Sequence, residues 1–303
     1  MLPGPHVHPG AHRDLRWPDA VPCSEPPVPT FALVDAFTDR AFAGNPAGVV
    51  LLDEPVDPAW AQVVAAEVRA SETAFVSPND DGTFALRWWT PTAEVDLCGH
   101  ATLAAAHVLI GSGDHDDDGD GEVVRFHTRS GLLTVTRTAA ADPGQPPLLV
   151  MDLPAWPPRA RPAPDTLAAA LGDVPHDYHG RNDQDQVFDL VEVADVATLV
   201  GLTPRLDAVT ALGGTGLIVT TAGTGDVDIA SRVFAPAVGV DEDPVTGSAH
   251  AVLGPWWAAR LGRDRLVAEQ RSARGGRLAL TVTDDRVAVA GRCVTVIRGM
   301  LLA

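Results

Sequence analysis

The sequence has 303 residues, of which 46% are hydrophobic and 20% charged, and its formal net charge is −18. This length and composition predict a globular protein of one large or two medium domains. The negative charge argues against nucleic acid or an anionic membrane as a partner, since both require basic surfaces. The three cysteines, Cys23, Cys98 and Cys293, lie far apart, which disfavours a disulfide scaffold or a zinc site. We therefore expect a cytoplasmic protein that acts on small molecules.

The first thirty residues are rich in Pro and His and predict a flexible extension, although their segment HVHPGAH (residues 6–12) has metal-binding side chains. Folding is expected to begin with a strand at Phe31–Phe37, followed by a Gly-Asn-Pro turn and a second strand. The next segment predicts a helix with Asp57 as N-cap and Pro58 at its first position.

The rest of the first half predicts short strands around one apolar helix. This helix, GHATLAAAHVLIG, has apolar residues on all sides, which indicates burial. The predicted strands are TAFVS, TFALRWW, the hairpin of VVRFHT with GLLTVTRT, and LLVMDL. Pro-rich segments bracket the last of these strands, and they predict a domain boundary near residue 145.

The second half predicts a similar set of elements. PDTLAAALG and GSAHAVLGPWWAARLG are expected as helices, and Pro255 is expected to kink the second helix or to end its first part. The expected strands are TGLIVTTAG, DIASRVFAP, RLALTVT and RVAVAGRCVTVIRG.

Three matches between the halves indicate an internal repeat. RWWTP (Arg87–Pro91) and RVFAP (Arg232–Pro236) share the pattern Arg, any residue, aromatic, any residue, Pro. CGHA and TGSA follow downstream as X-Gly-X-Ala, and a Gly-led strand follows each helix. If the two units face each other, both helix N-termini point into the cleft between them. That arrangement suits a substrate carboxylate or an enolate, and Gly99 and Gly247 let ligand atoms approach the backbone.

Proton transfer is the chemistry that two facing half-sites favour. A two-base racemase would use Cys98 and Thr246, but a threonine hydroxyl is too weakly acidic to match a thiol. Glu72 is either a partly buried acid with a raised pKa or a surface acid, and counting along the repeat pairs it with Leu217. His100 is either a titrating group or a buried structural histidine. Three further residues are either capping or core groups or parts of the site: Asp243, Ser248 and Cys98.

Four segments together resemble the PhzF-like family of phenazine biosynthesis: AFTDRAFAGNPAGVVLL, SETAFV, DLCGHATLAAAHVL and DEDPVTGSAHAVL. The resemblance runs in the same order from about Phe31 to the C-terminus. It implies an α/β (α+β) fold of two pseudo-symmetric diaminopimelate epimerase-like domains, each a mixed sheet wrapped around a central helix. The predicted divisions are the extension at 1–30, the N-terminal domain at 31–145 and the C-terminal domain at 146–303.

The resemblance also implies a mechanism. Glu72 matches the acid/base that moves a proton on trans-2,3-dihydro-3-hydroxyanthranilate in the family's isomerase, and the substrate expected here is a small carboxylate of that kind. Catalytic assistance is implied for His100, Asp243 and Ser248, and substrate binding for Cys98, Gly99, Thr246 and Gly247. No cofactor or metal is implied, and the assembly is expected to be a homodimer.

Two other functions stay open at the level of sequence. One is a racemase or dehydratase of the proline-racemase kind that uses Cys98 and Thr246. The other is a non-catalytic ligand-binding protein on the same fold. Incorporation of solvent deuterium into a ligand separates an enzyme from a binder, since a binder incorporates none.

Overall fold

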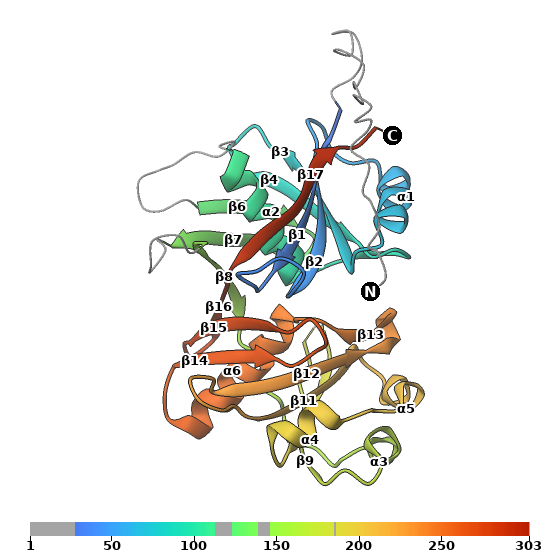
Figure 1. Ribbon diagram of the computed structural model, residues 1–303, viewed down its shortest axis with the longest axis vertical. Coiled ribbons are helices and arrows are strands. Elements are labelled where there is room, and N and C mark those ends of the chain that lie inside the picture. Colours follow the sequence, from blue (N-terminus) through green and yellow to red (C-terminus); the bar gives the residue numbers. More distant parts are fainter. Residues whose placement is uncertain (1–27, 113–122, 139–145, 185, 303) are drawn as a thin grey trace, which may run out of the picture.

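The computed structural model describes residues 28–112, 123–138, 146–184 and 186–302, so most of the predicted extension at 1–30 lies outside the described residues. The described chain forms two lobes, which lie one above the other in Figure 1. None of the helices in these parts of the chain is long and apolar enough to cross a membrane.

The first lobe is a mixed sheet with helices on both faces. Because side chains alternate along a strand, Ala74 and Val76 face the core around α2 (Gly99–Ser112), whereas Phe75 between them packs towards α1 (Pro58–Val68). The buried side chains of α2 lie on all sides of the helix, as its sequence predicts. The strands of this lobe are β1 (Thr30–Ala36), β2 (Asn45–Leu51), β3 (Glu72–Pro78), β4 (Phe84–Trp89), β5 (Glu94–Val95), β6 (Val123–Thr128), β7 (Gly131–Thr138) and β8 (Leu148–Pro154).

The second lobe repeats this plan. On β12, Val233 belongs to the core around α6 (Gly247–Leu261), and its neighbour Phe234 packs with the three short helices on the opposite face. Those helices are α3 (Asp165–Leu171), α4 (Val196–Gly201) and α5 (Leu206–Ala211). The strands are β9 (His176–Arg181), β10 (Phe188–Val193), β11 (Gly216–Ala222), β12 (Ile229–Ala235), β13 (Val240–Asp243), β14 (Arg265–Gln270), β15 (Gly276–Val282) and β16 (Arg286–Gly291), with the single turn η1 (Pro236–Val238) between β12 and β13.

Strand pairing confirms the internal repeat. In the first lobe β2 and β3 run parallel, β3 and β4 antiparallel, and β4 and β6 parallel across α2. In the second lobe β10 and β11, β11 and β12, and β12 and β14 pair in the same three ways, and α6 takes the place of α2. The predicted fold class, two pseudo-symmetric halves with a central helix each, is therefore confirmed.

The duplication extends to side chains. Arg87 on β4 forms a two-point ion pair with Glu94 on β5, with nitrogen–oxygen distances of 2.7 and 2.9 Å. Arg232 on β12 forms the same pair with Glu242 on β13, at 2.7 and 2.8 Å. Each guanidinium also covers the aromatic ring two residues further on, which is Trp89 or Phe234, at 4.7 and 4.8 Å from the ring centre.

The two lobes are joined by strands. The β8 strand pairs with β7 of its own lobe and with β16 of the other. The last strand, β17 (Cys293–Met300), leaves the second lobe and pairs with β1 in the first, where Figure 1 shows it in red. The domain boundary predicted near residue 145 stays a prediction.

Among the local predictions, the start of α1 is confirmed and the extent of one turn is wrong. The α1 helix begins at Pro58 and its N-cap Asp57 accepts a hydrogen bond from the Trp60 amide, as predicted. Pro255 does not end the first part of its helix, because α6 continues through it to Leu261. The alternative, a kink at Pro255, stays a prediction. The predicted Gly-Asn-Pro turn is also shorter than expected, since β2 already begins at Asn45.

Candidate active site

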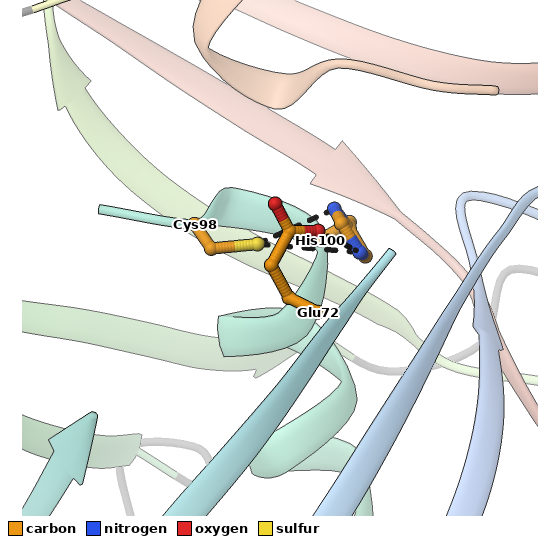
Figure 2. A group of neighbouring side chains, drawn as sticks. All are labelled: Glu72, Cys98 and His100. Carbon is orange, nitrogen blue, oxygen red and sulfur yellow. Dashed lines mark hydrogen bonds and ion pairs between the residues drawn. The ribbon is translucent and has the colours of Figure 1, made fainter. Parts of the chain in front are cut away.

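Glu72 occupies the first position of β3, at the side of the sheet that faces the second lobe. Its side chain is 16% exposed, and its Oε2 atom lies 3.3 Å from Nε2 of His100. His100 is the second residue of α2 and is buried. The thiol of Cys98, immediately before α2, lies 3.4 Å from Nδ1 of the same ring. Figure 2 shows the three side chains pointing towards one another.

Asp243 comes from the second lobe and joins this group through Asn45 in the first. The amide nitrogen of Asn45 donates to Asp243 Oδ1 at 2.7 Å and to the Val245 carbonyl at 2.9 Å, and it lies 3.2 Å from His100 Nδ1. The Ser71 hydroxyl donates to Oδ1 of Asn45, which leaves the amide nitrogen facing the other lobe. Asn45 therefore connects the predicted catalytic residues of both halves.

Gln270 of β14 fixes the loop that contains Thr246 through hydrogen bonds to its backbone. The Thr246 hydroxyl donates to Asp243 Oδ2 at 2.5 Å, and its backbone amide donates to Oε1 of Gln270 at 2.9 Å. Gln270 is fully buried and donates to the Asp243 carbonyl at 2.6 Å. Both oxygens of the Asp243 carboxyl thus have donors, and the Thr246 hydroxyl is committed to that carboxyl.

The two helix N-termini meet at the glycines. A Cβ atom placed on Gly99 would lie 3.7 Å from the Cα of Gly247 and 2.9 Å from the methyl group of Met151, so no larger residue fits there without movement. The Thr246 side chain at the start of α6 makes no capping hydrogen bond. Both helix starts, with their partial positive charge, face the space between the lobes.

A small cavity of about 70 Å³ lies between these groups. It is lined by residues of both halves. Every predicted site residue is among them, namely Glu72, Cys98, Gly99, His100, Asp243, Thr246, Gly247 and Ser248. Their roles stay predictions, but the structure brings the whole set together around one space.

The electrostatics of this space favour neutral groups. Burial, and then the charge of Asp243, raise the pKa of Glu72 to about 8, although a hydrogen bond with Cys98 lowers it in part. Burial lowers the pKa of His100 to about 3. The contact between Glu72 and His100 is therefore a hydrogen bond between neutral groups at pH 7, rather than an ion pair. A protonated carboxyl next to a neutral imidazole can give a proton and take it back.

The thiol has the opposite tendency from a catalytic nucleophile. Burial and the neighbouring charge of Glu72 raise the pKa of Cys98 well above its usual value. Burial also raises the pKa of Asp243, while hydrogen bonds from Thr246 and Asn45 lower it. Glu72, Cys98 and His100 each offer a donor atom, and these atoms lie within 4.8 Å of one another, so the group could hold a metal ion.

Sequence reasoning did not identify Asn45 or Gln270 as site residues. Asn45 stands in a Gly-Asn-Pro segment that predicts a turn. Gln270 is the last residue of β14, and no sequence motif distinguishes it. The signal that was available is the polarity of Asn45 at the head of an apolar strand. Counting along the repeat also paired Glu72 with Leu217, and this is wrong by one position. Thr73 pairs with Trp89 and Leu217 pairs with Phe234, so Gly216 is the counterpart of Glu72.

Comparisons with known proteins relate this chain to one family. The PhzC-PhzF family of phenazine biosynthesis-like proteins matches residues 34–299. An uncharacterized isomerase of Halalkalibacterium halodurans is 43% identical over 272 residues, which are 89% of this chain and 97% of that protein. The human phenazine biosynthesis-like domain-containing protein is 39% identical over 298 residues, 91% of this chain and 99% of that protein.

Solved structures show the same fold. A PhzF-family phenazine biosynthesis protein of Enterococcus faecalis superposes with a TM-score of 0.80 at 36% identity and covers 91% of this chain and 100% of that one. A hydroxyproline epimerase of Agrobacterium vitis, at 14% identity and a TM-score of 0.62, covers 90% of this chain and 92% of that one and shares the fold alone.

Relatives that match almost the whole of this chain are named isomerases, which identifies the class of this protein as an isomerase. Within that class, the family model matches almost the whole described chain, and the relatives are 39% to 43% identical to it. Both findings point to one particular family. The chain belongs to the PhzC-PhzF family of phenazine biosynthesis-like proteins.

Proposed function

We propose that this protein is a cofactor-independent isomerase that moves a proton between carbons of a small carboxylated substrate, with Glu72 as its acid/base. The observation that carries the proposal is the place of the Glu72 carboxyl, which is 16% exposed, lines the cavity between the lobes and lies 3.3 Å from His100. Burial there raises its pKa to about 8. An acid/base with a pKa near the working pH can both accept and return a proton. The substrate class is a conjugated carboxylate similar to trans-2,3-dihydro-3-hydroxyanthranilate.

The remaining residues have supporting roles in this proposal. The substrate carboxylate binds to the backbone N–H groups at the starts of α2 and α6, next to Gly99 and Gly247. Glu72, once ionised, removes a proton from one carbon, and conjugation with the carboxylate stabilises the electron pair as an enolate. The same carboxyl then returns the proton to another carbon. His100 and Asp243 hold the Glu72 carboxyl in position for proton transfer, and Ser248 contacts the substrate.

A racemase that uses Cys98 and Thr246 has less support. The thiol is kept protonated by burial, and the Thr246 hydroxyl donates to Asp243 at 2.5 Å, so neither group is prepared to remove a proton. Cys98→Ser separates the two mechanisms, because it should disable a thiol base and leave proton transfer by Glu72 within a few-fold of the wild type.

The proposal is tested by a screen of small carboxylates in deuterium oxide. The expected result is deuterium incorporation by the wild-type protein and none by Glu72→Gln, which keeps the shape of the side chain but cannot accept a proton. Thermal unfolding of both proteins controls for folding. Equal incorporation by the variant would contradict the proposal, and the absence of incorporation into any carboxylate would favour the non-catalytic binder.

A further inference from the structure

The group of Glu72, Cys98 and His100 has the composition of a metal site. In the described parts of the chain it is the one set of three such donors that lie within 4.8 Å of one another. Sequence reasoning disfavoured a zinc site because the cysteines are isolated from one another. The fold, however, supplies the other two donors from β3 and from the first turn of α2.

The distances between the donor atoms suit a four-coordinate ion. Zinc bonds of about 2.0–2.3 Å place neighbouring ligand atoms of a tetrahedron roughly 3.3–3.8 Å apart. Here Nε2 of His100 lies 3.3 Å from Oε2 of Glu72 and 4.0 Å from Sγ of Cys98. All three donor atoms lie within 4.8 Å of one another.

The charges of the donor groups and the volume of the adjacent cavity also suit a divalent cation. A thiolate and a carboxylate would neutralise a divalent cation, and the Asp243 carboxyl lies nearby, because the Asn45 amide that donates to it at 2.7 Å also lies 3.2 Å from His100. The cavity beside the three donors has a volume of about 70 Å³, and one water takes about 30 Å³ of liquid volume. An ion bound to the three side chains therefore has room for water in its fourth position.

The histidine is already oriented for such a role. A hydrogen bond with the Pro46 carbonyl and the contact with the Asn45 amide at 3.2 Å hold the ring in place. Outer partners of this kind orient metal-binding histidines in general. The mixture of sulfur, nitrogen and oxygen donors selects Zn²⁺ and similar thiophilic ions over Mg²⁺ or Ca²⁺, which prefer oxygen.

We infer that Glu72, Cys98 and His100 form a binding site for a thiophilic divalent cation such as Zn²⁺, which inhibits the protein. Binding forms bonds from the cation to Sγ of Cys98 and to a carboxylate oxygen of Glu72, and the protons of the thiol and of the carboxyl are both released to solvent. The same ion takes the Glu72 carboxyl out of proton transfer. The inhibitory part rests on the proposed function, whereas the binding part does not.

Titration of the full-length protein with Co²⁺ tests the site, since a cobalt–thiolate bond gives a near-ultraviolet charge-transfer band and needs no substrate. We expect the band to saturate at one Co²⁺ per chain and to be displaced by Zn²⁺. Cys98→Ala should abolish the band. His100→Asn and Glu72→Gln should each weaken Co²⁺ binding at least about 100-fold. Loss of a residue that only hydrogen-bonds a metal ligand already costs up to about 100-fold in affinity, and loss of a direct ligand should cost no less.

Two control variants make the assignment specific. Cys293→Ala removes the other described cysteine, which is also buried, and it should leave the band unchanged. A variant with His6, His8 and His12 all changed to Ala removes the imidazoles of HVHPGAH and should leave it unchanged as well. Cys98→Ser keeps the size of the side chain and guards against a folding defect in Cys98→Ala.

The inference is overturned if the wild-type protein shows no thiolate band. It is also overturned if the band survives in both Cys98 variants, or if it disappears in either control variant. Failure of this test leaves the isomerase proposal intact, since that proposal depends on deuterium exchange. A protein that binds Co²⁺ through Cys98 but exchanges no proton would instead support the site and contradict the proposed function.

Discussion

The two halves of the site share their frame but not their chemistry. At the second turn of each central helix a side chain bonds back to the carbonyl of the residue before the helix. Thr102 donates to Cys98 at 2.6 Å, and His250 Nδ1 donates to Thr246 at 2.7 Å. The ion pairs of Arg87 and Arg232 are likewise matched.

The reacting positions, by contrast, have diverged. In the internal repeat, the position of Glu72 corresponds to Gly216, and the position of His100 corresponds to Ser248. The counterpart of Cys98 is Thr246, so the proposed acid/base and the two side chains beside it, Cys98 and His100, all belong to the first half. The shared frame holds the N-termini of α2 and α6 against each other at Gly99 and Gly247. The chemistry needs only one acid/base if a single carboxyl both removes and returns the proton.

The largest expected effect separates the halves directly. Glu72→Gln should reduce proton exchange about 10²- to 10⁴-fold, the usual contribution of one general acid/base. Thr246→Val in the other half should reduce it much less, because the threonine hydroxyl only supports Asp243. Comparable losses in the two variants, measured by deuterium incorporation, would mean that both halves supply a base.

Asn45 is the next most sensitive position, since it connects the halves. Asn45→Ala removes the donors to Asp243 and to the Val245 carbonyl, and it should slow exchange about 10- to 100-fold, as the loss of an orienting partner does in metal sites. It should also lower the free energy of unfolding by about 1–3 kcal/mol, because buried acceptors lose their donor. Urea unfolding and exchange rates measured on the same samples check both effects, and unchanged exchange would deny Asn45 an orienting role.

The matched ion pairs allow a quantitative comparison of the two frames. Arg232→Met should destabilise the protein by about 3 kcal/mol and Arg87→Met by about 1 kcal/mol. The difference arises because the Arg232 guanidinium also donates to the carbonyls of Leu199, Val200 and Leu202. Urea unfolding midpoints measure both variants, and equal losses would show that these additional bonds contribute little.

The pH dependence of stability gives a smaller and more specific signal. Glu72 has a raised pKa in the folded protein, so its contribution to stability is complete below pH 4.5 and is lost as the pH rises towards 8. His100 has a lowered pKa, so its contribution is complete above pH 6.5 and is lost as the pH falls towards 3. Glu72→Gln should therefore flatten the decline in thermal stability between pH 4.5 and 8, and an unaltered decline would place its cause elsewhere.

Much of the fold can be predicted from local sequence. The Asp57–Pro58 start of α1, the buried helix at Gly99 and the short motifs after Arg87 and Arg232 all carry local or repeated patterns. The path of β17 cannot be predicted in this way, because its pairing with β1 joins the two ends of the described chain. The continuation of α6 through Pro255 depends on tertiary packing, which outweighs the local preference of proline.

The residues of the candidate site can likewise be predicted in part from the sequence, whereas their contacts cannot. Motif position and resemblance identify Glu72, His100 and Asp243 as candidates, and the structure brings them together. Their contacts are not visible in sequence, because Asn45 meets Asp243 from almost 200 positions away. For the same reason the nearness of Cys98 to Glu72, and hence the proposed metal site, follows only from the three-dimensional arrangement.

The proposed acid/base chemistry is tested most directly by the titration of the Glu72 carboxyl itself. Carbon-13 NMR of protein labelled at the glutamate side-chain carboxyl, with Glu72→Gln to assign the resonance, follows its protonation without any substrate. We expect this carboxyl to stay protonated at neutral pH and to titrate near pH 8. A midpoint near 4.5, the ordinary value for glutamate, would contradict the claim that one half of the site holds a neutral acid prepared for proton transfer.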